Sequence, residues 1–208
     1  MRFVSLMAVV IVFLGISGSV GAADCNQGGN LVSNCDFATD MTDWSLFYGD
    51  SWSHQGSDGA TALGSVEIDA EFLGGKQVMG VSEYRARIDS GCMPFPEGTA
   101  WDWGISAKLV GGGRGTQTSC DIRATFYSGV ACTGGLGSAS GGSGGIPQID
   151  STWQEGFAED SGISPATTQS VIFSVYCVNN SADFVVRIDD ALFGQNLVPV
   201  ELMAFSVE

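Results

Sequence analysis

The sequence lacks the periodicity of α-helices, since no long stretch places apolar residues at spacings of three and four. It also has a single histidine, no Cys-x-x-Cys pair, and only 8 lysines and arginines against 23 aspartates and glutamates. These shortages argue against a zinc–thiolate site and a Ser-His-Asp hydrolase, and no phosphate loop or dinucleotide fingerprint occurs. The net charge of −15 repels nucleic acids and anionic lipid surfaces. It favours cations or neutral molecules as ligands.

The N-terminal segment has the pattern of a secretory signal peptide. Arg2 precedes an apolar run from Phe3 to Ile16, which is short for a membrane span. Small residues follow, and the final Gly21–Ala23 fits signal-peptide cleavage after Ala23, or alternatively after Ala22. No second apolar run of membrane length occurs. We therefore expect residues 1–23 to be removed, leaving a secreted protein, extracellular or periplasmic, without a membrane span.

What the sequence does contain is period-two alternation of apolar and polar side chains. Four stretches show it: 101–109, 120–127, 171–178 and 184–189. Such alternation is typical of half-buried strands, and the 30 glycines fall mostly between the apolar runs. We predict an all-β fold, a two-sheet antiparallel β-sandwich.

The remaining segments set the expected domain boundaries. One domain over residues 24–197 accounts for the alternating strands. Within it, the Gly/Ser-rich segment 134–145 has no side chains suited to a core, and we expect a surface loop. Residues 198–208 form a C-terminal tail or an edge strand.

Six cysteines in an exported protein predict three disulfides. Several pairings are compatible with the sequence, and proximity along the chain favours two local bonds and one long-range bond. The expected pairs are Cys25–Cys35, Cys120–Cys132 and Cys92–Cys177.

Five short segments, in the right order, resemble motifs of cellulase-C-type carbohydrate-binding modules. They are residues 30–37 with Trp44, 64–68, 96–101, 152–154 and 188–192. The resemblance implies a jelly roll of galactose-binding-like fold. It also implies a non-catalytic module whose partner is a polysaccharide or a cell-surface glycan. The chain departs from the family at Ala38, where an acidic residue is usual.

The same resemblance implies one structural Ca²⁺. Asp190 has the parity of the apolar residues in its stretch, so it points to the core if the strand is regular. A buried carboxylate needs a partner, and calcium binds oxygen ligands. Asp36 and Asp40 are the expected co-ligands, Asp40 replacing the acid missing at Ala38. The alternative is that Asp190 accepts hydrogen bonds from backbone amides.

Two places suit contact with a sugar. Trp52 lies in the polar segment 49–56, where we expect a loop and an aromatic plane that stacks on a pyranose ring. Asp121, Arg123 and Tyr127 share the polar face of their strand and can hydrogen-bond to sugar hydroxyls, although an ordinary solvated face gives the same pattern. The other tryptophans are expected in the core, namely Trp44, Trp101, Trp103 and Trp153.

Residues 67–74 also match the "EIDxEFLG" catalytic strand of lichenase- and laminarinase-type hydrolases. That resemblance makes Glu67 the nucleophile, Asp69 an assisting acid and Glu71 the acid/base of a retaining β-glucanase. Alternate residues share one face of a strand, so two carboxylates there can reach the ~5–5.5 Å separation of retaining enzymes. The tryptophan-rich strands of those enzymes are missing. Hydrolysis stays an alternative, as does a surface or matrix domain that binds proteins.

Overall fold

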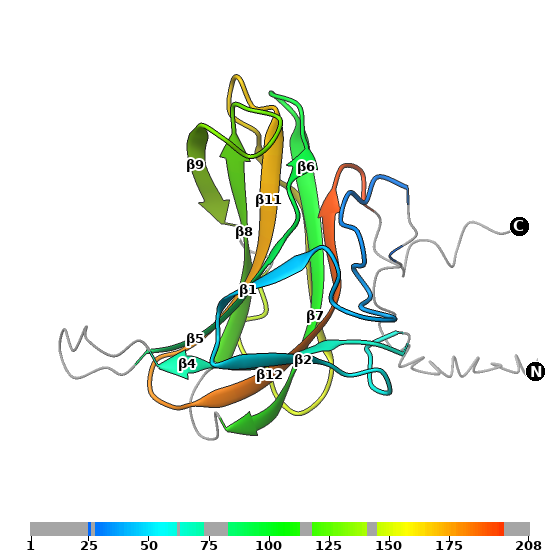
Figure 1. The fold of residues 1–208 in the computed structure, drawn as a ribbon, viewed down its shortest axis with the longest axis vertical. Helices are drawn as coiled ribbons and strands as arrows, with labels where there is room; N and C mark the ends of the chain where they lie inside the picture. Colours follow the sequence, from blue (N-terminus) through cyan, green and yellow to red (C-terminus); the bar gives the residue numbers. More distant parts are fainter. Residues whose placement is uncertain are drawn as a thin grey trace, which may run out of the picture.

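The computed structural model describes residues 25, 28–61, 63–72, 83–112, 118–140 and 145–197. Within these residues the chain forms two antiparallel β-sheets and no helix (Figure 1). None of the described residues forms a helix long and apolar enough to cross a membrane. The expected signal peptide (1–23) and C-terminal tail (198–208) lie outside the described residues.

The larger sheet has seven strands among the described residues. Its main path runs β1 (Trp44–Tyr48), β5 (Tyr84–Ser90), β11 (Ser170–Asn179), β8 (Thr118–Tyr127) and β9 (Gly135–Ser140). Two short strands extend it, β4 (Glu71–Phe72) beside β5 and β6 (Met93–Pro94) beside β11. Except for β8 and β9, neighbours on this path are far apart in sequence, so the sheet assembles its outer face from distant segments.

The smaller sheet has five described strands. Their order is β10 (Gln154–Ile163), β7 (Ala100–Gly112), β12 (Phe184–Gly194), β3 (Val66–Asp69) and β2 (Ser51–His54). Every strand pair in both sheets is antiparallel. The predicted all-β, two-sheet antiparallel sandwich is therefore confirmed.

The core lies between the two sheets and is built from the alternating apolar residues. Phe193 on β12 packs against Trp101 on β7 and Phe173 on β11, with ring centroids 5.4 Å apart in both pairs. Such tilted ring contacts add to the burial of apolar area. Trp44, Trp101 and Trp103 are buried, as expected. Trp153 is only half-buried, and the Lys108 ammonium lies 4.8 Å from its ring centroid.

The expected loop over residues 134–145 is wrong for its first half. Gly135–Ser140 is strand β9, which pairs with β8 at the sheet edge. Small residues suffice there because the backbone supplies the ladder hydrogen bonds, and Ala139 packs against the core. Gly137 has φ of 116°, which suits glycine, beside an irregularity in the register.

Three disulfides are present, and two of the expected pairings are wrong. Cys25–Cys35 is found as predicted. The other two bonds are Cys92–Cys132 and Cys120–Cys177. Cys120 and Cys177 lie directly opposite each other on β8 and β11, with Cα atoms 4.1 Å apart, so strand register decides the pairing. Proximity along the chain does not reveal that register.

Candidate functional site

Aromatic and arginine side chains gather on the outer face of the larger sheet. On β5, β8 and β11 they alternate with core residues, as Arg85 and Arg87 do with the buried Ala86 and Ile88 on β5. This alternation places them on the side of the sheet that faces away from the core. On β1, Phe47 and Tyr48 are consecutive, at a register shift. We call this set the arginine–aromatic face; its members are Phe47, Tyr48, Arg85, Arg87, Arg123 and Tyr176.

Cation–π contacts connect these side chains across four strands. The Arg85 guanidinium carbon lies 5.6 Å from the Tyr48 ring centroid and 5.8 Å from that of Tyr176. The Arg123 guanidinium carbon lies 5.5 Å from the same Tyr176 centroid. Arg87 lies closest to its ring, 4.2 Å from the Phe47 centroid. Guanidinium groups within about 6 Å of an aromatic ring are attracted by its quadrupole, so the contacts order the face.

Two acidic residues hold the arginines of β5 in place. Arg87 donates from Nε and Nη2 to both carboxylate oxygens of Asp89, at 2.6 and 3.0 Å, and from Nη2 to Ser174 Oγ at 3.0 Å. Arg85 donates from Nε to Glu83 at 2.7 Å. The Tyr176 hydroxyl donates to the same Glu83 oxygen at 3.4 Å. The face is thus preorganised by charge-assisted hydrogen bonds.

The ionisation of the face follows from these contacts. The hydrogen bond to Glu83 raises the pKa of Arg85, so its guanidinium is charged at every relevant pH. Burial raises the pKa of the Tyr176 phenol, which therefore stays a neutral hydroxyl. Burial also raises the pKa of Asp121. The hydrogen bond from the Ile122 amide and the charge of Arg123 act to lower this pKa, but burial outweighs them.

The predicted sugar-contacting residues divide between the two sheets. Asp121, Arg123 and Tyr127 lie on the outward side of β8, opposite the buried Ile122, as the alternation indicates. The expected loop around Trp52 is wrong. Trp52 lies in strand β2 of the other sheet, opposite Ile68, and packs partly against the core.

Sequence reasoning missed five members of the face. They are Phe47, Tyr48, Arg85, Arg87 and Tyr176. The alternation of 84–90 was a usable signal for the two arginines, since charged residues there alternate with apolar ones. The two aromatic residues on β1 are harder to assign, because a register shift between Leu46 and Tyr48 breaks the alternation.

The residues of the hydrolase alternative do not share a strand. Glu67 and Asp69 point outward on β3, whereas Glu71 lies on β4 in the other sheet, opposite Arg85. The predicted single catalytic strand is therefore wrong. The chain changes sheet at the buried Ala70, whose N–H donates to Phe184 O.

Glu67 belongs instead to an ion-pair network on the smaller sheet. Arg187 donates from Nε to Glu67 at 2.9 Å and also binds Asp58. Lys108 Nζ donates to Asp58 at 2.7 Å. Burial acts to raise the pKa of Asp58, but the hydrogen bonds and charges of Lys108 and Arg187 outweigh it and lower that pKa.

Two consecutive carboxylates are buried on β12, at Asp189 and Asp190. The strand is not regular there, contrary to the expectation for Asp190, because the register shifts between Asp189 and Leu192 and Asp190 has φ of 46°. Asp190 accepts a hydrogen bond from Ser106 Oγ at 3.4 Å, and Ser106 alternates with the core residues Ile105 and Ala107, so Asp190 does not face the core as expected. Asp189 and Asp190 are instead buried under the segment that carries Ala60 and Thr61. Asp189 accepts hydrogen bonds from the Ala60 and Asp190 amides at 2.6 and 2.8 Å, and Asp190 accepts one from Thr61 Oγ1 at 2.9 Å.

The groups around Asp189 and Asp190 include one of the two residues expected to bind calcium together with Asp190, namely Asp36. Burial and the Asp190 charge raise the pKa of Asp189 to about 8, and Asp36 adds a smaller effect of the same sign. The Ala191 amide donates to the Cys35 carbonyl at 2.9 Å, so the backbone next to Asp36 lies beside the strand that carries the pair. Asp40 is exposed and accepts hydrogen bonds from Asn34 Nδ2 and the Thr42 amide. Among the described residues, no group of three or more His, Cys, Asp or Glu is arranged to hold a metal ion.

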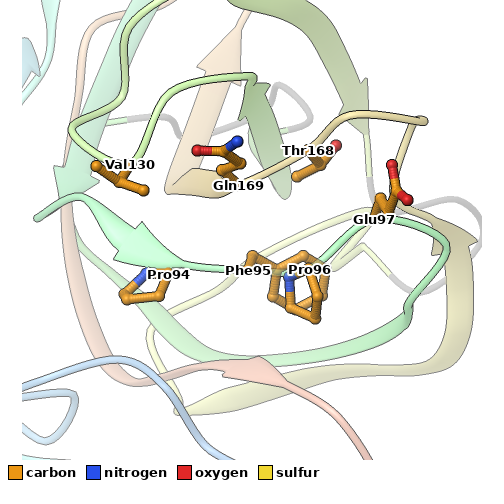
Figure 2. Close-up of a pocket in the computed structure, with 7 residues that line it drawn as sticks. All are labelled: Pro94, Phe95, Pro96, Glu97, Val130, Thr168 and Gln169. Carbon is orange, nitrogen blue, oxygen red and sulfur yellow. The ribbon is translucent and has the colours of Figure 1, made fainter.

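A surface pocket of about 460 Å³ lies at the end of the sandwich near β6 (Figure 2). Its lining is Pro94, Phe95, Pro96, Glu97, Val130, Thr168 and Gln169. The one carboxylate in that lining, Glu97, accepts a hydrogen bond from the Thr167 amide at 2.5 Å. The pocket shares no residue with the arginine–aromatic face, which has the richer set of charged and aromatic groups.

Comparisons with known proteins give structural similarity alone. No protein-family model matches the chain, and no curated protein matches it. Among solved structures, the family 61 carbohydrate-binding module TmCBM61, solved with β-1,4-galactotriose, has a TM-score of 0.54 at 12% identity. That match covers 80% of this chain and 99% of the module.

Two further solved structures are similar. The C-terminal family 22 carbohydrate-binding module of Clostridium thermocellum Xyn10B has a TM-score of 0.54 at 8% identity, covering 83% of this chain and 99% of that one. The enzymatically active domain of bacteriophage CBA120 tailspike protein 4 has a TM-score of 0.53 at 14% identity. This match covers 79% of this chain but only 21% of the tailspike domain. The chain therefore has the β-sandwich fold seen in these carbohydrate-binding modules.

Proposed function

We propose that the chain is a secreted, non-catalytic module that binds a polysaccharide or cell-surface glycan on the arginine–aromatic face. The observation that carries this proposal is the exposed ring of Phe47, held beside Arg87 on an ordered sheet face. Phe47 is 53% exposed, although aromatic side chains gain most by burial. The apolar C–H side of a pyranose ring suits such a ring, and neighbouring guanidinium and hydroxyl groups suit its oxygens.

The fold agrees with this proposal. TmCBM61 and the family 22 module have the same sandwich, and TmCBM61 was solved with a galactotriose. An outer sheet face built from rigid strands holds ligand-binding side chains more precisely than a loop does. Residues 1–23, as a signal peptide, would direct export of the module to an oxidising compartment, which suits its three disulfides.

A structural Ca²⁺ is part of the proposal. Asp190 and Asp189 supply adjacent buried carboxylates, and Cys35, which precedes Asp36, accepts a hydrogen bond from the Ala191 amide. This donor set fits the ion in part, since calcium takes oxygen ligands and a divalent cation would neutralise two buried carboxylates. Backbone carbonyls or water would complete the coordination. The ion would stabilise the fold away from the arginine–aromatic face and takes no part in sugar binding.

The direct test compares glycan binding by wild type, Phe47→Ala and Phe72→Ala. Phe72 is a matched control, because it is 50% exposed but packs on Tyr84 and is not part of the face. On a glycan array followed by calorimetry, we expect the Phe47 variant to bind about ten-fold more weakly and the Phe72 variant to bind normally. No binding of wild type to any glycan contradicts the proposal and favours a protein-binding surface domain.

A further inference from the structure

Positive charge is concentrated on the arginine–aromatic face. Although the chain carries a net charge of −15, three of the five described basic side chains belong to this face. They are Arg85, Arg87 and Arg123. The other two, Lys108 and Arg187, share Asp58 on the smaller sheet. The face also carries the carboxylates of Glu83, Asp89 and Asp121, so its preference for a ligand depends on which hydrogen-bond donors and acceptors are still available, not on net charge.

Three carboxylates near the face already accept hydrogen bonds within the protein, and a fourth, Glu71, lies opposite Arg85 in the pairing of β4 with β5. Asp89 accepts from Arg87 with both oxygens. Glu83 accepts from Arg85 and from the Tyr176 hydroxyl. Asp121 accepts from the Ile122 amide at 2.7 Å. A ligand that must donate hydrogen bonds therefore meets carboxylates that already have partners.

Some hydrogen-bond donors on the arginine–aromatic face, in contrast, have no acceptor among the described residues. Arg123 is exposed, and in the described part of the chain its guanidinium has no hydrogen bond or ion pair. It lies beside the ring of Tyr176, and its charge acts to lower the pKa of Asp121. Arg85 uses Nε for Glu83, and its two terminal nitrogens have no partner among the described residues. A guanidinium offers five N–H donors in a planar fork that matches a carboxylate.

This surplus of donors selects the chemistry of the ligand. A neutral sugar offers hydroxyls that both donate and accept, whereas a carboxylate only accepts. The face supplies spare donors on both sides of Tyr176, with Arg85 and Arg123 each within 6 Å of its ring centroid. Resting on the proposed glycan-binding function, we propose that the ligand is an acidic polysaccharide whose uronate carboxylate pairs with Arg123.

The test uses polymers that differ only in charge. Polygalacturonate and alginate are each compared with their methyl esters, which keep the backbone and lose the carboxylate charge. Wild type is expected to bind at least one acidic polymer about ten-fold or more tightly than its ester, because hydrogen bonds to charged groups exceed neutral ones. Arg123→Gln removes this preference, and binding falls to the level of the ester.

Lys108→Gln is the matched control, because it removes one positive charge from the smaller sheet. It is expected to keep the preference, with thermal melting confirming that both variants fold. Equal binding to acid and ester, binding to neutral glycans alone, or tighter binding to dextran sulfate overturns the inference while glycan binding stands. Binding to no glycan overturns the proposed function as well.

Discussion

Removal of the Cys120–Cys177 disulfide is expected to cost the fold about 4 kcal/mol. The bond joins residues separated by 57 positions, and the loop-entropy model gives this value for a loop of that length. Both cysteines are fully buried on adjacent strands, so alanine at both positions leaves only a small packing defect. The free energy of unfolding of a typical domain is about 5–15 kcal/mol, so the variant still folds if the wild type lies near the upper end of this range.

The assay is guanidinium denaturation of wild type and of the double variant Cys120→Ala, Cys177→Ala. The free energy of unfolding is extrapolated to water, and the slope reports whether the unfolded state has expanded. Peptide mapping without reduction tests the pairing itself and should recover residues 120 and 177 in one linked peptide. A loss below about 1 kcal/mol, or a linked peptide joining Cys120 to Cys132, refutes the reasoning.

Three further predictions follow from charged groups. The folded protein lowers the pKa of Asp58 from its ordinary value of 3.8. The ionised carboxylate therefore stabilises the fold at pH values above 3.8, and this contribution is lost as the pH falls below 3.8 and the carboxylate takes up a proton. Asp58→Asn should therefore lower the unfolding free energy by about 1 kcal/mol at pH 7, and this difference should shrink below pH 4 in denaturation curves. If Asp190 holds calcium, adding EDTA should lower the melting temperature of wild type but not of Asp190→Asn, and an EDTA-insensitive wild type contradicts the site. Because Glu71 lies on a different sheet from Glu67, wild type should release no reducing sugar from β-1,3/1,4-glucans; release that Glu67→Gln abolishes contradicts this placement.

Local alternation in the sequence was sufficient to predict the fold class. It also placed Asp121, Arg123 and Tyr127 on the outward side of their strand, because side chains of a strand alternate regardless of which strand lies beside it. Pairing between distant strands is a different matter. It depends on long-range packing, so the partner of Cys120 and the neighbours of Arg123 on β11 could not be read from spacing.

Irregular backbone accounts for the other differences. At the shift between Asp189 and Leu192, two consecutive acids are buried under the segment that carries Ala60 and Thr61, whereas consecutive side chains of a regular strand point to opposite faces. The change of sheet at Ala70 likewise separates Glu67 from Glu71, although their spacing alone indicates a common face. Both features depend on contacts with residues far away in the sequence, such as the bond from the Ala70 amide to Phe184.

The most direct test of glycan binding on the arginine–aromatic face is a calorimetric titration of the mature protein with polygalacturonate and alginate oligosaccharides, repeated with Phe47→Ala. The account predicts saturable binding by wild type to at least one of them. It also predicts about ten-fold weaker binding by the variant, with an unchanged melting temperature. Equal affinities of wild type and the variant would contradict the assignment of the ligand to this face.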